Sequence, residues 1–234
     1  MVVNVLQNLH QKTYRLETIV IEQKNPFYST QKNYAREVEV YYYGKVKDRH
    51  DFQILVTHFD FSDEEGTMDQ FLKKISYLFD EIECKVDDEG NITAVDNILF
   101  LRLRWTKILA NLSETHKGEA IDRYFSQISD LLEDEVKLID FLGSYNMFGL
   151  LFNGLLNSFD TKMKRESTEG FTEIMTPVKS GDTLTLRVSA ENLEASDVES
   201  FKGVFICKRD QYEEGFIEIK KQNSHLKHSL LWIG

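Results

Sequence analysis

Residues 145–159 read Tyr145-Asn-Met-Phe-Gly-Leu-Leu-Phe-Asn-Gly-Leu-Leu-Asn-Ser-Phe159, an apolar run that the rest of the chain must cover. A membrane-spanning helix needs roughly 20 apolar residues, whereas this run is shorter and is interrupted by asparagines. We therefore predict a buried core helix over 146–159. Its predicted core side chains are Phe148, Leu151, Phe152, Leu155 and Phe159.

The apolar run follows the longest helical pattern in the chain. From Ile121 to Leu142, apolar residues recur at steps of three and four, which places them on one stripe of a helix. Charged residues occupy the other faces. We predict one helix over 119–142, and similar stripes predict helices over 65–80 and 97–116.

Toward both ends of the chain the apolar period changes to two, which is typical of strands. We predict antiparallel sheet over 36–61 and 173–233, and a further strand over 16–22. A hairpin is predicted over 82–95, with its turn glycine where a positive φ is needed. The charged stretch 160–170 is interpreted as a surface connection.

Strands first, helices in the middle and strands last predict an α+β fold. In this prediction, the N-terminal and C-terminal strands form an antiparallel sheet around a central helical region. The whole chain, 1–234, is predicted to be a single domain. Its subdivision would be sheet at 1–61 and 171–234, and a mainly helical part at 62–160 that includes the hairpin.

Composition limits the classes of partner. With 41% hydrophobic and 12% aromatic residues, the 234-residue chain can build a sizeable core. Its formal net charge of -11 argues against nucleic acid and anionic membranes, because both require clustered Lys and Arg. The same charge would steer a basic protein toward it.

The sequence does not contain a metal-binding, cofactor-binding or export motif. Cys84 and Cys207 have neither metal-site nor redox spacing, so we expect buried free thiols. The spacing from Gly149 to Gly154 imitates half of a phosphate loop, but Leu155-Leu156 stands where Lys and Ser or Thr would be needed. We expect no metal and no cofactor. The first residues lack the pattern of a signal peptide, so we expect a cytoplasmic protein.

One segment resembles a known group of proteins. Asp88-Glu-Gly-Asn-Ile-Thr-Ala-Val-Asp-Asn97, followed by Leu101, Arg104 and Trp105, resembles a hairpin-then-helix pattern in uncharacterised proteins of Bacteroidota, several of them lipoproteins. The resemblance covers about a third of the chain. It implies a sheet that flanks a central helical stretch, and it brings no functional residues with it.

Three classes of function remain. The first is a non-enzymatic protein-interaction module that binds a basic partner, such as a toxin, an effector or an assembly component, through an acidic face. The candidate residues of that face lie in one turn and on one helix: Asp87, Asp88, Glu89, Asp130, Glu133 and Asp134. For each of them, the ordinary alternative is a carboxylate that only keeps the surface solvated.

The second class is a binding module for a small apolar ligand, because aromatic-rich strands around an apolar helix can leave a pocket as easily as fill it. The third is an enzyme that uses dispersed residues such as His58, Asp60 and Arg104. Arg102 and Arg104 are also candidates for contacting an anion, although paired arginines more often answer neighbouring carboxylates. The oligomeric state is not fixed by the sequence.

Overall fold

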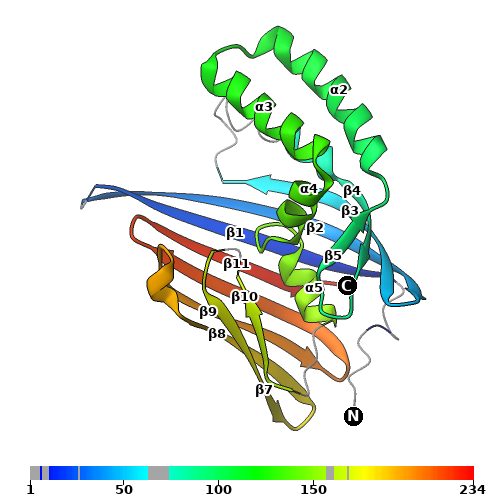
Figure 1. The fold of residues 1–234 in the computed structure, drawn as a ribbon, viewed down its shortest axis with the longest axis vertical. Coiled ribbons are helices and arrows are strands. Elements are labelled where there is room, and N and C mark those ends of the chain that lie inside the picture. Colours follow the sequence, from blue (N-terminus) through cyan, green and yellow to red (C-terminus); the bar gives the residue numbers. More distant parts are fainter. Residues whose placement is uncertain (1–5, 7–10, 26, 63–73, 157–160, 168) are drawn as a thin grey trace.

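One large antiparallel sheet dominates the structure (Figure 1). It is seen in a computed structural model that describes the chain outside residues 1–5, 7–10, 26, 63–73, 157–160 and 168. The α+β prediction is wrong, because strands take 53% and helices 29% of the structure, and the helices are few and small beside an 11-stranded sheet.

The sheet has the order β5-β4-β3-β2-β1-β11-β10-β9-β8-β7-β6. Its strands are β1 (Gln11–Asn25), β2 (Tyr28–Val46), β3 (Arg49–Phe61), β4 (Glu81–Val86), β5 (Ile92–Val95), β6 (Met163–Glu166), β7 (Thr172–Ser180), β8 (Thr183–Glu191), β9 (Val198–Lys208), β10 (Gln211–Lys221) and β11 (Ser224–Trp232). Strands that follow one another pair as hairpins within each half, and β1 pairs with β11 to join the halves. The N-terminal and C-terminal strands therefore do share one sheet, as predicted.

The helices are α2 (Ile98–Thr115), α3 (Glu119–Glu133), α4 (Glu135–Gly143) and α5 (Gly149–Leu156), with short 3-10 turns η2 (Tyr77–Phe79) and η3 (Leu193–Ala195). The helix predicted over 97–116 is α2. Of the helix predicted over 65–80, residues 65–73 lie outside the described part, residues 74–76 are helical, and the end forms η2.

The prediction of a single helix over 119–142 is wrong, because the helix is interrupted at Asp134. The Asp134 carboxylate accepts hydrogen bonds from the backbone N–H of Val136 at 3.0 Å and of Lys137 at 3.3 Å. Asp134 is thus the N-cap of α4, and its extended backbone ends α3. Likewise, the connection predicted over 160–170 contains the edge strand β6.

Helix α5 forms from the apolar run and is buried, as predicted. Phe148, Leu151 and Phe152 are fully buried and Leu155 nearly so, whereas Phe159 lies outside the described residues. None of the described helices has the length and apolar character that crossing a membrane requires. The predicted cytoplasmic location stays a prediction.

Helix α5 is seated against β10 by one tyrosine. The buried Tyr212 hydroxyl donates to the backbone carbonyl of Leu150 at 2.8 Å. A Cβ at Gly154 would lie 1.9 Å from Cζ of the Tyr212 ring, and one at Gly215 would lie 2.2 Å from its hydroxyl oxygen. The absence of side chains at both glycines therefore makes room for the ring between helix and sheet.

The two ends of the sheet both reach α5, around which the strands curve (Figure 1). In the β4–β5 turn, Gly90 lies so close that a Cβ there would be 2.9 Å from the carbonyl oxygen of Phe152. From β6, Arg165 Nη1 donates to Asn153 Oδ1 at 2.5 Å. Helix α5 thus bridges the two ends of the sheet.

Candidate functional site

A cavity of about 490 Å³ lies between the sheet and the segment that runs from the end of α4 into α5. We call it the inner cavity. Its apolar floor crosses four neighbouring strands, because the register places Val20 opposite Leu226, Leu226 opposite Ile219, and Ile219 opposite Phe201. Phe171 extends this floor toward β7, with its ring centroid 4.8 Å from that of Phe201.

His228 is a polar side chain in that floor. It lies opposite Thr18 in the register, and its Nδ1 is 3.0 Å from the Thr18 hydroxyl oxygen. Only 4% of its surface is exposed. Burial lowers the pKa of the imidazole to about 4, so the ring is neutral near pH 7.

A cluster of four polar side chains also lines the cavity: Tyr145, Asn153, Arg165 and Glu173. Arg165 donates from Nη2 to Glu173 Oε2 at 2.6 Å and to the Tyr145 hydroxyl at 2.8 Å, besides its bond to Asn153. The Tyr145 hydroxyl in turn donates to Glu173 Oε2 at 2.9 Å. We call this the Arg165 cluster.

The charges of the Arg165 cluster are internally balanced. Glu173 is 3% exposed, and a buried carboxylate needs a paired cation, which Arg165 supplies. Burial lowers the pKa of Arg165, but Tyr145 and Glu173 raise it by more, so the guanidinium keeps its proton. Burial also raises the pKa of Tyr145, which leaves its hydroxyl neutral and able to donate.

Two polar atoms in the cavity wall are left available for hydrogen bonding. Glu173 Oε1 and His228 Nε2 have no hydrogen-bond partner among the described residues. Within the described part of the chain, Asp51 Oδ1 is the one buried side-chain N or O atom sealed from solvent without a partner. Glu173 Oε1 and His228 Nε2 are therefore not sealed from solvent. Because both residues line the cavity, a ligand there could satisfy these two atoms.

The arrangement is suited to binding. Ligand sites of roughly 300–1,000 Å³ with apolar walls and a few convergent polar groups are the usual pattern for small molecules. Within the described ranges, no three His, Cys, Asp or Glu side chains gather in a way that could hold a metal ion. Cys84 and Cys207 are buried free thiols, as predicted, and burial raises the pKa of both.

The six carboxylates predicted for an acidic face lie in two places. Asp87, Asp88 and Glu89 form the β4–β5 turn, whereas Asp130, Glu133 and Asp134 lie at the end of α3. No hydrogen bond or ion pair among the described residues joins the two groups.

Several of these carboxylates have local structural roles. Asp87 Oδ1 accepts from the backbone N–H of Asn91 at 2.8 Å, which shapes its turn. Asp88 accepts from Lys45 at 2.7 Å, and His50 Nε2 lies 2.8 Å from it. Asp134 caps α4. A role in partner binding for any of them stays a prediction.

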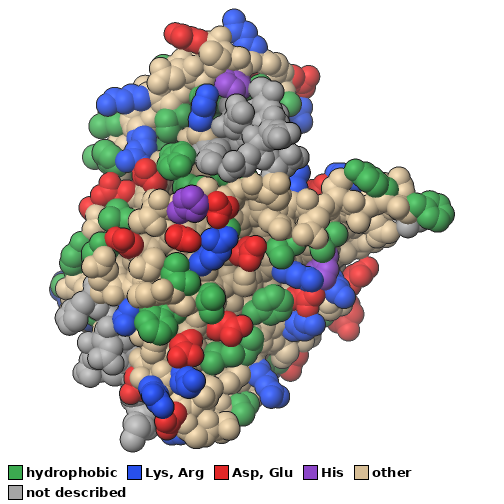
Figure 2. All heavy atoms as spheres, turned by 180° about the vertical axis from the view of Figure 1, so that it is seen from behind, with side chains coloured by type: hydrophobic (Ala, Val, Ile, Leu, Met, Phe, Trp, Pro, Cys, Tyr) green, Lys and Arg blue, Asp and Glu red, His purple; other side chains and the backbone are tan. Residues whose placement is uncertain are grey.

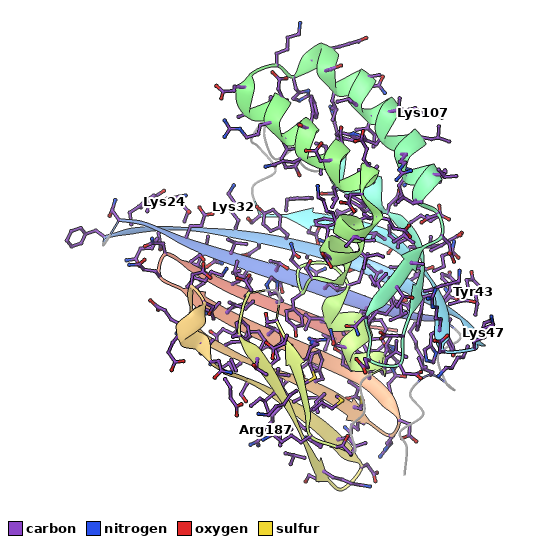
Figure 3. All side chains as sticks on the ribbon, in the orientation of Figure 1. Lys24, Lys32, Tyr43, Lys47, Lys107 and Arg187 are labelled. Atoms are coloured by element: carbon purple, nitrogen blue, oxygen red, sulfur yellow. The ribbon has the colours of Figure 1, made fainter. Side chains whose placement is uncertain are left out.

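On one face of the molecule the surface charges are interspersed. On the face seen in Figure 2, acidic and basic side chains alternate with apolar ones instead of gathering by sign. Lys24 and Lys32 lie along the projecting β1–β2 hairpin, Lys107 on α2 and Arg187 on β8, so basic side chains are spread over distant elements (Figure 3).

The two predicted anion-contacting arginines both make intramolecular contacts. Arg102 donates to the carbonyl oxygens of Leu132 at 2.7 Å and Glu133 at 3.1 Å, and so satisfies the C-terminal end of α3. Arg104 pairs with Asp80 and lies 4.6 Å from the centroid of the Phe100 ring. An anion at either side chain would have to compete with these contacts.

The residues suggested for an enzyme are only partly together. His58 Nε2 lies 2.8 Å from Asp60 Oδ1, and this hydrogen bond lowers the pKa of the Asp60 carboxyl, with Arg15 adding to the effect. Both side chains are about half exposed, and Arg104 contacts Asp80 instead. The pair and Arg104 therefore form no shared site.

Sequence reasoning missed the inner cavity residues. For some of them the sequence holds a signal, which is a charged residue inside an apolar strand. Residues 171–175 are all buried, and Glu173 is the one charged residue among them. Asn153 is likewise a polar residue within an apolar helix. Such buried polar positions are uncommon and point to a partner or a site. Arg165 and His228 gave no comparable signal.

Comparison with known proteins gives no family for this mostly-β protein. No protein-family model and no curated protein matches the chain. A structure described as lipid-protein interactions in lipovitellin is similar with a TM-score of 0.49 and 10% identity over 96% of this chain, which spans only 25% of the lipovitellin chain. The crystal structure of Rv2717c from M. tuberculosis has a TM-score of 0.29 and 10% identity, with 98% of each chain covered. Neither value supports an inference about function, and the resemblance to Bacteroidota proteins stays a prediction.

Proposed function

We propose that this protein is a binding module for a small, largely apolar ligand, held in the inner cavity. The observation that carries the proposal is the pairing of an apolar floor with two polar atoms, Glu173 Oε1 and His228 Nε2, that have no hydrogen-bond partner in the described part of the chain, in a space of about 490 Å³. The floor supplies hydrophobic binding energy at roughly 25 cal/mol per Å² of apolar surface buried. The polar atoms supply orientation.

The experiment uses a pair of substitutions on adjacent residues of β1. Val20 lines the cavity, whereas the side chain of Ile19 points to the opposite face, because successive residues of a strand alternate. Val20→Trp should place a large ring inside the cavity, and Ile19→Trp places the same ring outside it. Both positions are half-buried, which makes the two variants a matched pair.

Binding is measured with Nile red, a neutral apolar dye, and by its displacement with decan-1-ol. We expect saturable binding to the wild type and to Ile19→Trp, and a loss of roughly tenfold or more in affinity for Val20→Trp, equivalent to about 1.4 kcal/mol. Absence of saturable binding, or an equal loss in both variants, would contradict the proposal.

A further inference from the structure

We infer that the inner cavity selects ligands whose polar head is neutral or cationic and donates a hydrogen bond, and that it rejects carboxylates. This inference rests on the proposed function and names its ligand class. It separates an alcohol or an amine with an apolar chain from the fatty acid of the same length.

The first reason is that the cationic side chain in the cavity wall already has hydrogen-bond partners. Among the described residues that line it, Arg165 is the one Lys or Arg. Its guanidinium is engaged by Glu173 Oε2, Asn153 Oδ1 and the Tyr145 hydroxyl. A ligand carboxylate that displaced Glu173 from Arg165 would leave that residue as a buried carboxylate without a partner, which is costly.

The second reason is the kind of hydrogen bond that the wall still offers. Glu173 Oε1 belongs to a carboxylate that is paired with Arg165, so it can only accept. A hydroxyl or an ammonium group can donate to it, whereas an ionised carboxylate cannot. His228 Nε2 is neutral at pH 7 and offers an anion no charge to pair with.

The third reason is the charge near the cavity mouth. Asp140, Glu166 and Glu169 line the cavity and are exposed, and among the described residues only Glu169 has a basic partner, Lys221, at 2.6 Å. Unit charges 4 Å apart interact by about 1 kcal/mol in water and by about 4 kcal/mol near a protein surface. These carboxylates therefore disfavour an entering anion and favour a cation.

The experiment compares three probes with the same ten-carbon chain: decylamine, decan-1-ol and decanoate, each at pH 7 below its aggregation limit. Affinities are measured by Nile red displacement and by native mass spectrometry. We expect decylamine and decan-1-ol to bind, and decanoate to bind at least about tenfold more weakly. Val20→Trp is run in parallel, because decylamine bound to the acidic outer surface would not respond to it.

A charge-removing variant tests the cause. Glu173→Gln keeps the size of the side chain and leaves Arg165 without its carboxylate, so decanoate should gain roughly tenfold relative to decan-1-ol. If that variant does not fold, the exposed double variant Glu166→Gln with Glu169→Gln replaces it. This variant should weaken the binding of decylamine relative to that of decan-1-ol.

The outcomes separate this inference from the proposed function. If none of the three probes binds, the proposed function fails, and the inference fails with it. If decanoate binds as tightly as decan-1-ol or more tightly, the head-group inference is overturned while the binding function stands. Decylamine binding that is unaffected by Val20→Trp would also overturn it.

Discussion

Replacement of Gly154 by Ala tests how α5 is held in the sheet. A Cβ there would lie 1.9 Å from Cζ of Tyr212, whereas ordinary contact begins near 3.4 Å, so the ring would have to move by about 1.5 Å. On its other side the ring hydroxyl lies over Gly215, where an added Cβ would be 2.2 Å away. Overpacking of this kind costs about 1–3 kcal/mol, and the full enclosure of Tyr212 places it near the upper end.

The gain in helix propensity from Gly to Ala offsets about 1 kcal/mol of this cost. A net loss of about 2 kcal/mol remains, which lowers the midpoint of thermal unfolding by about 4–8 °C in a domain of this size. Gly143→Ala is the control, because that glycine also lies in a helix and a Cβ there meets nothing within 4 Å. It should leave the midpoint unchanged or raise it slightly.

Both variants are followed by circular dichroism during heating. The losses in unfolding free energy caused by Tyr212→Leu and by Gly154→Ala should not add up in the double variant, since the smaller Leu side chain removes the clash with the new Cβ. A Gly154→Ala variant as stable as Gly143→Ala would refute the seating of α5 by Tyr212.

Three further predictions concern the core and the cavity. Phe152→Ala should lower the free energy of unfolding by about 3–5 kcal/mol in urea titrations, because the buried ring packs against Phe52; a loss below 1 kcal/mol would contradict this. Arg165→Met should lower the free energy of unfolding by about 3 kcal/mol, because it leaves Glu173 unpaired. Adding Glu173→Leu should recover most of this loss. A double variant no more stable than Arg165→Met alone would count against the pairing. Because burial lowers the pKa of His228 to about 4, the unfolded chain binds a proton below about pH 6.5 that the folded chain does not, so stability falls as pH falls from about 6.5 to about 4. The loss should reach about 2 kcal/mol at pH 5, and a pH dependence that His228→Gln does not flatten would contradict it.

Local periodicity predicted most of the individual elements but not how they assemble. The apolar stripe of α2 and the alternation along β3 are visible in the sequence, because burial of one face imposes them. The membership of β4 and β5 in the main sheet depends on pairing between β3 and β4, a contact that no local pattern encodes. For this reason the sequence predicts an α+β fold, whereas in the structure one sheet takes in every described strand.

The remaining local errors have side-chain causes. The apolar stripe continues across Asp134, so the helix break depends on one capping carboxylate that the period does not report. Strand β6 has the sequence Met163-Lys-Arg-Glu166, and its charged side chains hide it from an apolar search. Arg165 is half-buried there and pairs with Glu173 on the neighbouring strand β7. The Arg165 cluster joins β6, β7 and α5, so it exists only in the folded chain.

The most direct test of the account is where a bound ligand lies. An isotope-filtered nuclear Overhauser experiment, with labelled protein and unlabelled decan-1-ol, reports which methyl groups lie next to the alkyl chain. We predict contacts to the methyl groups of Val20, Ile219 and Leu226 on the cavity floor. Contacts confined to the exposed Leu99 and Leu103 of α2 would contradict binding in the inner cavity.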